Sequence, residues 1–160
     1  EEIAASTPRL EAMIFGMGDY SASQGLDFTA MYGPDYKYPG DVFHYAKFRV
    51  TMAARARGID AIDGPFANIS NLEAYRESCL QARALGMVGK WALHPTQIEH
   101  AQDVFTPNQD RIDEARKMTD AYNESLAAGR GAVMIDGKFA DAATVRHMAN
   151  VLDLAELYGL

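Results

Sequence analysis

The chain has 160 residues, of which 48% are hydrophobic and 23% charged, so it can form one soluble globular domain with a hydrophobic core. Its net charge of -7 argues against a nucleic-acid partner, because no basic stripe is available to follow a phosphate backbone. Arg49, Arg55 and Arg57 have the spacing of a solvated helix face. No run of about twenty apolar residues is present, so we expect no membrane-spanning segment.

A single cysteine, Cys79, excludes an intrachain disulfide. It lies in an amphipathic helical pattern, which predicts a small core residue and not a nucleophile. This cysteine usage fits a reducing compartment, and we expect a cytoplasmic protein. The first ten residues lack the basic and apolar regions of a signal peptide and lack an initiator Met. We therefore expect the chain to begin within a longer protein.

Residues 1–105 alternate strand and helix patterns. The apolar runs predict strands at 10–15, 59–62 and 88–93. The helical patterns cover 42–57, with Asp41 as a candidate cap, 72–85, with Asn68, Ser70 or Asn71 as candidate caps, and 97–105. This order is typical of right-handed βαβ units on a parallel sheet. Between the first two strands lies a tyrosine-rich stretch, 28–40, whose length fits either a functional loop or a surface flap.

Residues 106–160 depart from this alternation. We expect a helix at 109–126, a ribbon at 131–141 and a final helix at 142–157. Three βα units leave a parallel sheet without neighbours at its edges, and an eight-stranded barrel needs about 250 residues. The sequence therefore predicts an α/β fold with two parts. Residues 1–105 would be the C-terminal half of a TIM (β/α)8 barrel, and residues 106–160 a helical C-terminal lid extension.

Two side chains follow predicted strands and could carry chemistry. Asp19 comes after the first strand in a glycine-flanked turn, where a carboxylate can bind Mg²⁺ together with further oxygens. It could instead cap the following turn. His94, followed by Pro95, comes after the third strand and could point into a barrel mouth or be a structural histidine.

Other carboxylates have local structural explanations. Asp63 begins a DGP turn, Asp136 begins a DGK turn, and Asp141 can cap the last helix. No zinc-ligand spacing, glycine-rich phosphate loop or serine nucleophile elbow is present. The residues alone predict carboxylates at one face of an α/β domain, and they do not identify a reaction.

Four segments, in order along nearly the whole chain, carry a family resemblance: FGMGDYSAS, IDGPFANI, GKWALHPTQI and GAVMIDGKFADAAT. Together they resemble the malyl-CoA lyases of the citrate lyase β-subunit-like (HpcH/HpaI aldolase) superfamily, in its C-terminal half. The resemblance implies a TIM barrel whose C-terminal extension packs over the active site of a neighbouring subunit. It thus implies a homo-oligomer of at least two subunits, with dimer, trimer and hexamer left open.

The resemblance also implies an activity, the reversible cleavage of (S)-malyl-CoA to acetyl-CoA and glyoxylate. Related members cleave β-methylmalyl-CoA to propionyl-CoA and glyoxylate, or citramalyl-CoA to acetyl-CoA and pyruvate. The implied cofactor is Mg²⁺, with Mn²⁺ as an alternative. Three other interpretations stay open: a malyl-CoA thioesterase, a citrate lyase β-subunit-like protein, and a non-catalytic fragment.

The resemblance assigns roles to particular residues. Asp19 would bind the metal, with a Glu partner and a substrate-binding Arg upstream of residue 1. Asp141 would be the catalytic carboxylate, acting in trans with a pKa raised by burial, and Asp136 is the alternative. The residues expected beside substrate and the CoA thioester are Asp63, Gly64, Pro65, His94 and Pro95.

Overall fold

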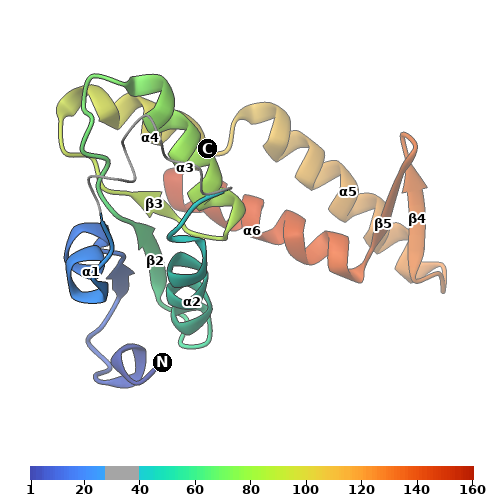
Figure 1. Ribbon diagram of the computed structural model, residues 1–160. Helices are drawn as coiled ribbons and strands as arrows, with labels where there is room; N and C mark the ends of the chain where they lie inside the picture. The colour runs from blue at the N-terminus through green and yellow to red at the C-terminus, as the bar shows by residue number, and fades with distance from the viewer. Residues whose placement is uncertain (28–39) are drawn as a thin grey trace. The chain divides into compact units, whose positions relative to one another are not determined.

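The computed structural model describes residues 1–27 and 40–160, which form two compact units, Glu1–Phe105 and Thr106–Leu160 (Figure 1). Most of the tyrosine-rich stretch, 28–39, lies outside the described residues, so its predicted functional role stays a prediction. The two units use different architectures. The first contains a parallel sheet and the second an antiparallel hairpin with two helices.

The first unit contains a three-stranded parallel sheet in the order β1-β2-β3. Its strands are β1 (Ala12–Ile14), β2 (Asp60–Asp63) and β3 (Gly89–Lys90). The helices between and after them are α1 (Met17–Gln24), α2 (His44–Arg55), α3 (Leu72–Ala84) and α4 (Ile98–Phe105). The register pairs Ile14 with Ile62, and Ile62 with Gly89. The α/β class is confirmed, and the arrangement is consistent with part of a TIM-barrel-type domain.

Small residues let the helices approach the central strand. Ala54 of α2, Ala61 of β2 and Ala82 of α3 are buried together with Met87. A second cluster contains Tyr75, Cys79 and Val104 from α3 and α4, so the prediction that Cys79 is a core residue is confirmed. Burial also raises the pKa of its thiol, as expected for an unreactive cysteine.

Several element boundaries differ from the sequence prediction, among them that of the first strand, which is Ala12–Ile14 and not 10–15. The third strand is shorter because the Leu93 amide donates to the side chain of Gln97, which turns the chain away from the sheet. A 3₁₀-helix (Pro95–Gln97) therefore precedes α4. α2 begins only at His44, and Asp41 caps the preceding turn by accepting a hydrogen bond from the Phe43 amide. Of the candidate caps, Asn71 holds the start of α3 by accepting from Ala74.

The second unit is a helix, a hairpin and a second helix: α5 (Gln109–Ala127), β4 (Ala132–Ile135), β5 (Lys138–Asp141) and α6 (Ala142–Tyr158). α5 and α6 pack along each other (Figure 1). The hairpin turn is Asp136-Gly137 with positive φ at both residues, as a two-residue turn between twisted strands requires. Ser125 of α5 donates to the Ala132 carbonyl and ties the helix to the hairpin.

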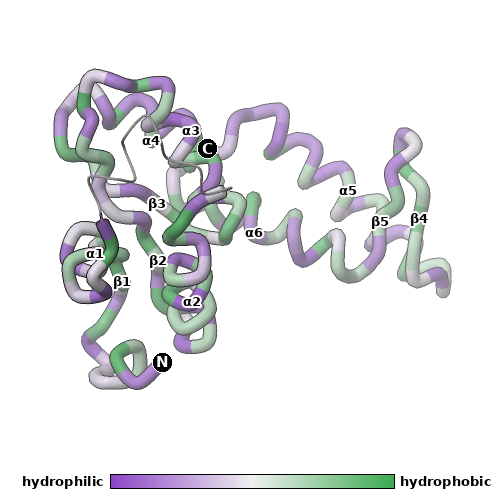
Figure 2. Tube along the Cα trace, in the orientation of Figure 1, coloured by the Kyte–Doolittle hydropathy of each residue, from purple (hydrophilic) through white to green (hydrophobic). Residues whose placement is uncertain are grey.

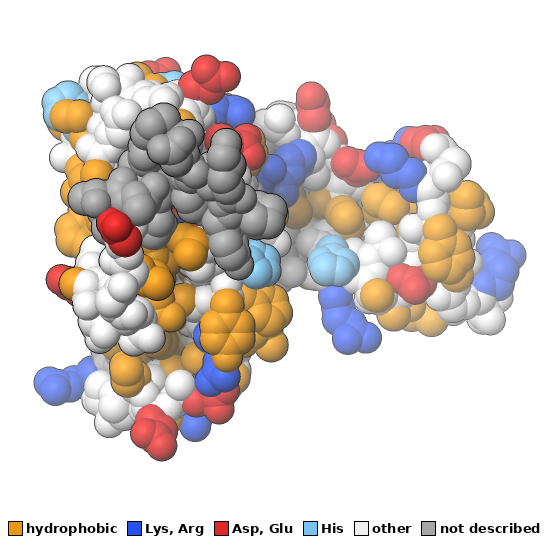
Figure 3. Space-filling view, viewed as in Figure 1, with side chains coloured by type: hydrophobic (Ala, Val, Ile, Leu, Met, Phe, Trp, Pro, Cys, Tyr) orange, Lys and Arg blue, Asp and Glu red, His pale blue; other side chains and the backbone are white. Residues whose placement is uncertain are grey.

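Surface properties differ along the chain. The middle of β2 is hydrophobic whereas α5 is largely hydrophilic (Figure 2). Hydrophobic side chains are visible on the surface of the first unit in Figure 3. Among them, Tyr45, Phe48 and Met52 follow one exposed face of α2. Arg49, Arg55 and Arg57 are exposed, as predicted. Within residues 1–27 and 40–160, no helix combines the length and apolar character needed to cross a bilayer.

Candidate functional site

The parallel sheet brings most of the predicted site residues to one edge. Because β1, β2 and β3 run in the same direction, their C-terminal ends lie together. Asp19 follows β1, residues 63–65 end and follow β2, and residues 94–95 follow β3. Asp141 lies in the other unit, at the junction of β5 and α6. The sequence thus predicted the edge of the sheet that collects these groups.

Asp19 is exposed, and it lies in the first turn of α1. The prediction of a glycine-flanked turn is wrong at this point, because α1 begins at Met17 and includes Gly18. The cap is Gly16, whose carbonyl accepts from the Tyr20 amide at 3.0 Å. The free N–H groups of a first helical turn favour a negative charge there. Asp19 is therefore held as an accessible carboxylate at the sheet edge.

A carboxylate in this position suits a hard cation. Mg²⁺ is commonly held by one or two carboxylates together with water and substrate oxygens. Asp19 fits one such ligand position. Among the described residues, no group of three or more His, Cys, Asp or Glu side chains is arranged to hold a metal ion. The described residues therefore contribute one suitable ligand and do not form a complete metal site.

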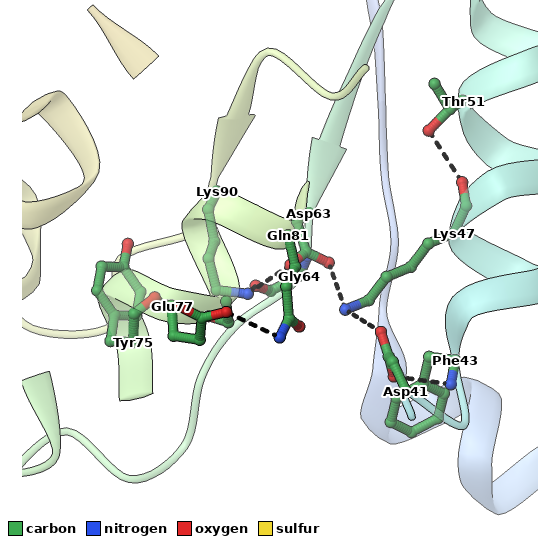
Figure 4. Close-up of polar contacts among 11 residues, drawn as sticks. Asp41, Phe43, Lys47, Thr51, Asp63, Gly64, Tyr75, Glu77, Gln81 and Lys90 are labelled. Carbon is green, nitrogen blue, oxygen red and sulfur yellow. Dashed lines mark hydrogen bonds and ion pairs between the residues drawn. The ribbon is translucent and has the colours of Figure 1, made fainter. Parts of the chain in front are cut away.

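Asp63 is buried beneath the edge between two lysines (Figure 4). Its Oδ2 lies 2.6 Å from Nζ of Lys90, and its Oδ1 lies 3.5 Å from Nζ of Lys47. The side chains of Asp63 and Lys90 have no exposed surface. This orientation directs the Asp63 carboxylate into the protein, and its predicted contact with substrate stays untested.

The ion pairs continue to Asp41, whose Oδ2 lies 3.0 Å from Nζ of Lys47. Charges alternate along Asp41, Lys47, Asp63 and Lys90, which we call the buried charge network. The network joins the turn before α2 to the ends of β2 and β3 (Figure 4). Burial lowers the pKa of the Lys90 amine, and the adjacent Asp63 opposes that shift.

Sequence reasoning missed both lysines of the network. Lys47 could have been found, because it is four residues from Phe43 and from Thr51, both on the buried side of α2. Lys90 ends a short buried strand, where a lysine is rare unless its charge is paired. Neither signal identifies the partner, because Asp63 is distant in sequence from both.

Gly64 has a structural reason to be glycine. A Cβ atom at this position would lie 2.0 Å from the carbonyl oxygen of Phe15, at the end of β1. Any side chain would therefore push the ends of β1 and β2 apart. The Gly64 amide donates to Asp63 Oδ1 at 2.9 Å, and its carbonyl accepts from Lys90 at 3.0 Å. Its predicted contact with substrate stays a prediction.

His94 is exposed and caps the short 3₁₀-helix. Its Nδ1 lies 2.9 Å from the hydroxyl of Thr96 and accepts from the Thr96 amide at 3.3 Å. The buried Gln97 side chain completes the cap by accepting from the amides of Leu93 and His94. These contacts match the structural alternative for His94. Pro95 is exposed beside it, and the predicted CoA contact of both residues is untested.

A hollow opens beside the buried charge network. The residues that line it include Met17, Phe43, Phe66, Asp41, Lys47 and Lys90. Asp41 and Asp63 balance the two lysine charges, so the hollow does not attract an anion by net charge. It is suited to a neutral or amphipathic group.

Asp141 caps α6. Its Oδ1 accepts hydrogen bonds from the amides of Ala143 and Thr144 and from the Thr144 hydroxyl, at 2.9 to 3.1 Å. These bonds favour the ionised form and hold the pKa of Asp141 below its ordinary value. In this unit alone the carboxylate is solvated and hydrogen-bonded at a helix start, and the pKa raised by burial under a lid stays a prediction.

Asp136, the alternative catalytic carboxylate, lies in the hairpin turn with φ of 49°. It forms an exposed ion pair with Lys117 of α5, which holds the pKa of Asp136 below its ordinary value. Both candidate catalytic carboxylates are thus ionised near neutral pH. Asp141 differs in that all three of its donors bind Oδ1.

Comparison with known proteins identifies the family. Residues 1–95 match the family HpcH/HpaI aldolase/citrate lyase. An L-malyl-CoA/beta-methylmalyl-CoA lyase from Cereibacter sphaeroides is 37% identical over 98% of this chain and 52% of its own length. A (3S)-malyl-CoA thioesterase from the same organism is 33% identical over 88% of this chain and 46% of its own length.

A solved structure supports the same assignment. The protein CitE from Mycobacterium tuberculosis, in complex with magnesium, acetoacetate and coenzyme A, has a TM-score of 0.77 at 27% identity. The match covers 97% of this chain and 55% of that one. The chain spans about half the length of the relatives it matches. The resemblance found in the sequence motifs is confirmed, and the chain belongs to the HpcH/HpaI aldolase/citrate lyase family.

Proposed function

We propose that this chain is the C-terminal half of a Mg²⁺-dependent lyase that reversibly cleaves (S)-malyl-CoA to acetyl-CoA and glyoxylate. The observation that carries the proposal is 37% identity over 98% of the chain to a malyl-CoA/beta-methylmalyl-CoA lyase. Cleavage of β-methylmalyl-CoA to propionyl-CoA and glyoxylate is part of the proposal. Residues 1–105 would supply the last βα units of a TIM barrel, and residues 106–160 a lid.

The reaction breaks the bond between the hydroxyl-bearing carbon and the CH₂ next to the thioester. The electron pair forms the enolate of acetyl-CoA, the hydroxyl-bearing carbon becomes the aldehyde of glyoxylate, and the net proton transfer is from that hydroxyl to the new methyl group. Mg²⁺ would supply positive charge beside the oxygens that gain charge. Asp19 is the described residue that would hold it, as an exposed carboxylate at the sheet edge.

Asp141 would give the proton to the enolate carbon during cleavage and remove it during condensation. Its Oδ2 would be the reacting oxygen, because the described donors all bind Oδ1. Closure of the lid over the site of a neighbouring subunit would remove water from Asp141 and raise its pKa towards the range that the chemistry needs. This role requires a homo-oligomer of at least two subunits.

Substitution of Asp141 by Asn in the full-length protein tests the catalytic role. Asn is as good a helix cap as Asp, so the second unit should still fold. We expect D141N to bind the CoA ester but to lose glyoxylate release. D136N is the matched comparison, because Asp136 is a nearby exposed carboxylate of the same unit. Undiminished turnover in D141N would refute the role, and loss of turnover in D136N alone would transfer it to Asp136.

A thioesterase is the second candidate, favoured by 33% identity to the (3S)-malyl-CoA thioesterase. The products separate the two reactions, because hydrolysis releases malate and CoA whereas cleavage releases glyoxylate and acetyl-CoA. We expect glyoxylate to be released in a Mg²⁺-dependent reaction, and a chelator that removes Mg²⁺ should abolish the release. Turnover by the 160-residue chain alone would exclude the third alternative, a non-catalytic chain that only assembles.

A further inference from the structure

We propose that Lys90 is a positioning residue for the carboxylate of Asp19, and that it acts through Gly64 and the end of β1. The inference deepens the proposed function, because it depends on Asp19 as a ligand of the metal. Lys90 does not itself reach the exposed Asp19 carboxylate. Its effect would pass through backbone groups of the two neighbouring strands.

Lys90 controls the peptide groups on both sides of Gly64 (Figure 4). Its Nζ donates to the Gly64 carbonyl at 3.0 Å and pairs with Asp63 Oδ2 at 2.6 Å. The other oxygen of Asp63 accepts from the Gly64 amide at 2.9 Å. Charge-assisted hydrogen bonds are short and directional. The ion pair therefore fixes the position of Gly64 at the end of β2.

Gly64 in turn fixes the end of β1. Its missing Cβ would fall 2.0 Å from the Phe15 carbonyl oxygen and 3.6 Å from the Met17 amide nitrogen, so the two backbones touch. The Phe15 amide donates to the Ile62 carbonyl at 3.1 Å. The last peptide of β1 is thus held by a strand hydrogen bond on one side and by the Gly64 backbone on the other.

The end of β1 sets the start of the helix that carries Asp19. Gly16 caps α1, and its carbonyl accepts from the Tyr20 amide, so the residues from Gly16 to Tyr20 form one hydrogen-bonded turn. A movement of Gly64 would move Phe15, and that movement would pass through Gly16 to Asp19. Positions of metal ligands are sensitive to such supporting contacts, because small displacements weaken coordination.

Stability alone does not account for Lys90. Replacing a buried ion pair with apolar residues of similar size is often neutral or stabilising. A methionine at position 90 could fill the space, but it could not hold the Gly64 carbonyl. Lys47 would remain beside Asp63, so K90M would leave that carboxylate with a partner. K90M still removes one member of a buried pair, which lowers stability, so the metal-binding and exchange measurements are what separate the loss of the link to Gly64 from that cost.

The experiment compares K90M with R76M in the full-length protein. Arg76 forms an exposed ion pair with Asp103 on the same unit. Two readouts are needed: Mn²⁺ binding followed by electron paramagnetic resonance, and hydrogen exchange of peptides covering residues 12–24. We expect K90M to weaken Mn²⁺ binding on the order of 10- to 100-fold and to raise exchange in 12–24, with R76M unchanged in both.

Kinetics then separates positioning from a loss of folded protein. A smaller folded fraction lowers kcat and leaves the half-saturating Mg²⁺ concentration unchanged, whereas a displaced Asp19 raises that concentration. K90Q, which keeps an N–H donor, should recover part of the metal affinity, and it carries the comparison if K90M does not fold. Normal Mn²⁺ binding and normal exchange in K90M would overturn the inference. Normal Mn²⁺ binding in D19N would instead refute the metal role of Asp19 and with it the proposed function. In that case the hydrogen exchange of residues 12–24 in K90M alone decides whether Lys90 controls the end of β1.

Discussion

Three candidate carboxylates, one in the first unit and two in the second, lie in opposite environments. In the first unit Asp63 is fully buried and shared by Lys90 and Lys47. In the second unit Asp136 and Asp141 are solvated, the former in a surface ion pair and the latter at a helix start. A buried carboxylate fixes the backbone around it, whereas a solvated one keeps an oxygen free for chemistry. The difference separates residues that shape a site from residues that can act in one.

The largest expected effect is the removal of the buried carboxylate. Asp63→Ala would leave two buried ammonium groups without their shared partner, and breaking a buried pair in this way lowers the free energy of unfolding by about 3–5 kcal/mol. Urea denaturation measures the change. Asp103→Ala, which breaks an exposed pair, should change it by about 1 kcal/mol or less. Equal losses in the two variants would contradict the contrast between buried and solvated carboxylates.

A smaller loss is expected at the contact between strands. Gly64→Ala would place a methyl group against the Phe15 carbonyl, and such overpacking typically lowers the free energy of unfolding by about 1–3 kcal/mol. Gly18→Ala is the matched control, because its Cβ would meet nothing within 4 Å and alanine favours a helix. Thermal unfolding should move in opposite directions for the two variants. An unchanged midpoint in Gly64→Ala would show that the strand ends can separate freely.

In the second unit the expected effect is on protonation. Thr144→Val removes the hydroxyl bound to Asp141 and should raise its depressed pKa towards about 3.9, which carboxyl ¹³C NMR can follow. A depressed native pKa contributes stability that is present above the ordinary pKa and is lost as pH falls through the native value. The variant should therefore lose less stability on acidification.

Thr144→Ser keeps the hydroxyl and should keep the low pKa. The charged groups on the elements packed against Asp141 include Arg146 and His147 on α6 and the Lys138–Glu114 pair between β5 and α5. None of them is among the main causes of the shift, which are hydrogen bonds from Thr144 and Ala143. An unchanged pKa in Thr144→Val would show that the amides alone set it.

The smallest effect is expected for the surface pair of Lys138 and Glu114. Lys138→Met removes the pair, yet both side chains are solvated, so we expect no measurable change in the unfolding midpoint. Lys90→Met, which removes the buried lysine, is the comparison. A clear loss in Lys138→Met would mean that the hairpin depends on surface charge as much as the sheet depends on buried charge.

Local sequence signals predicted those features that depend on neighbouring residues. The βα alternation and the Asp136-Gly137 turn each follow from a few adjacent side chains, and Asn71 is one of the three caps that the sequence offered for α3. The length of β3 was mispredicted because a side chain four residues ahead, Gln97, takes the hydrogen bond of Leu93. The start of α1 was mispredicted because two glycines favour a turn more strongly than they favour a helix.

The sequence predicted the position of a candidate site residue only where that residue follows a strand. Asp19 could be placed at the sheet edge from its position alone. Lys47 and Lys90 could not be assigned to Asp63, because their pairing depends on the packing of α2, β2 and β3. A lysine within a helix usually reaches solvent, so the pattern around Lys47 offers no partner.

The buried charge network links four positions that are 6, 16 and 27 residues apart along the chain: 41, 47, 63 and 90. A neutral residue at one of them leaves an odd charge among the other three. An evolving or redesigned member of this family therefore cannot lose these charges one at a time without passing through a destabilised intermediate. Homologues should keep the set or replace opposite charges in pairs, and libraries that vary one of these positions should vary its partner in the same round.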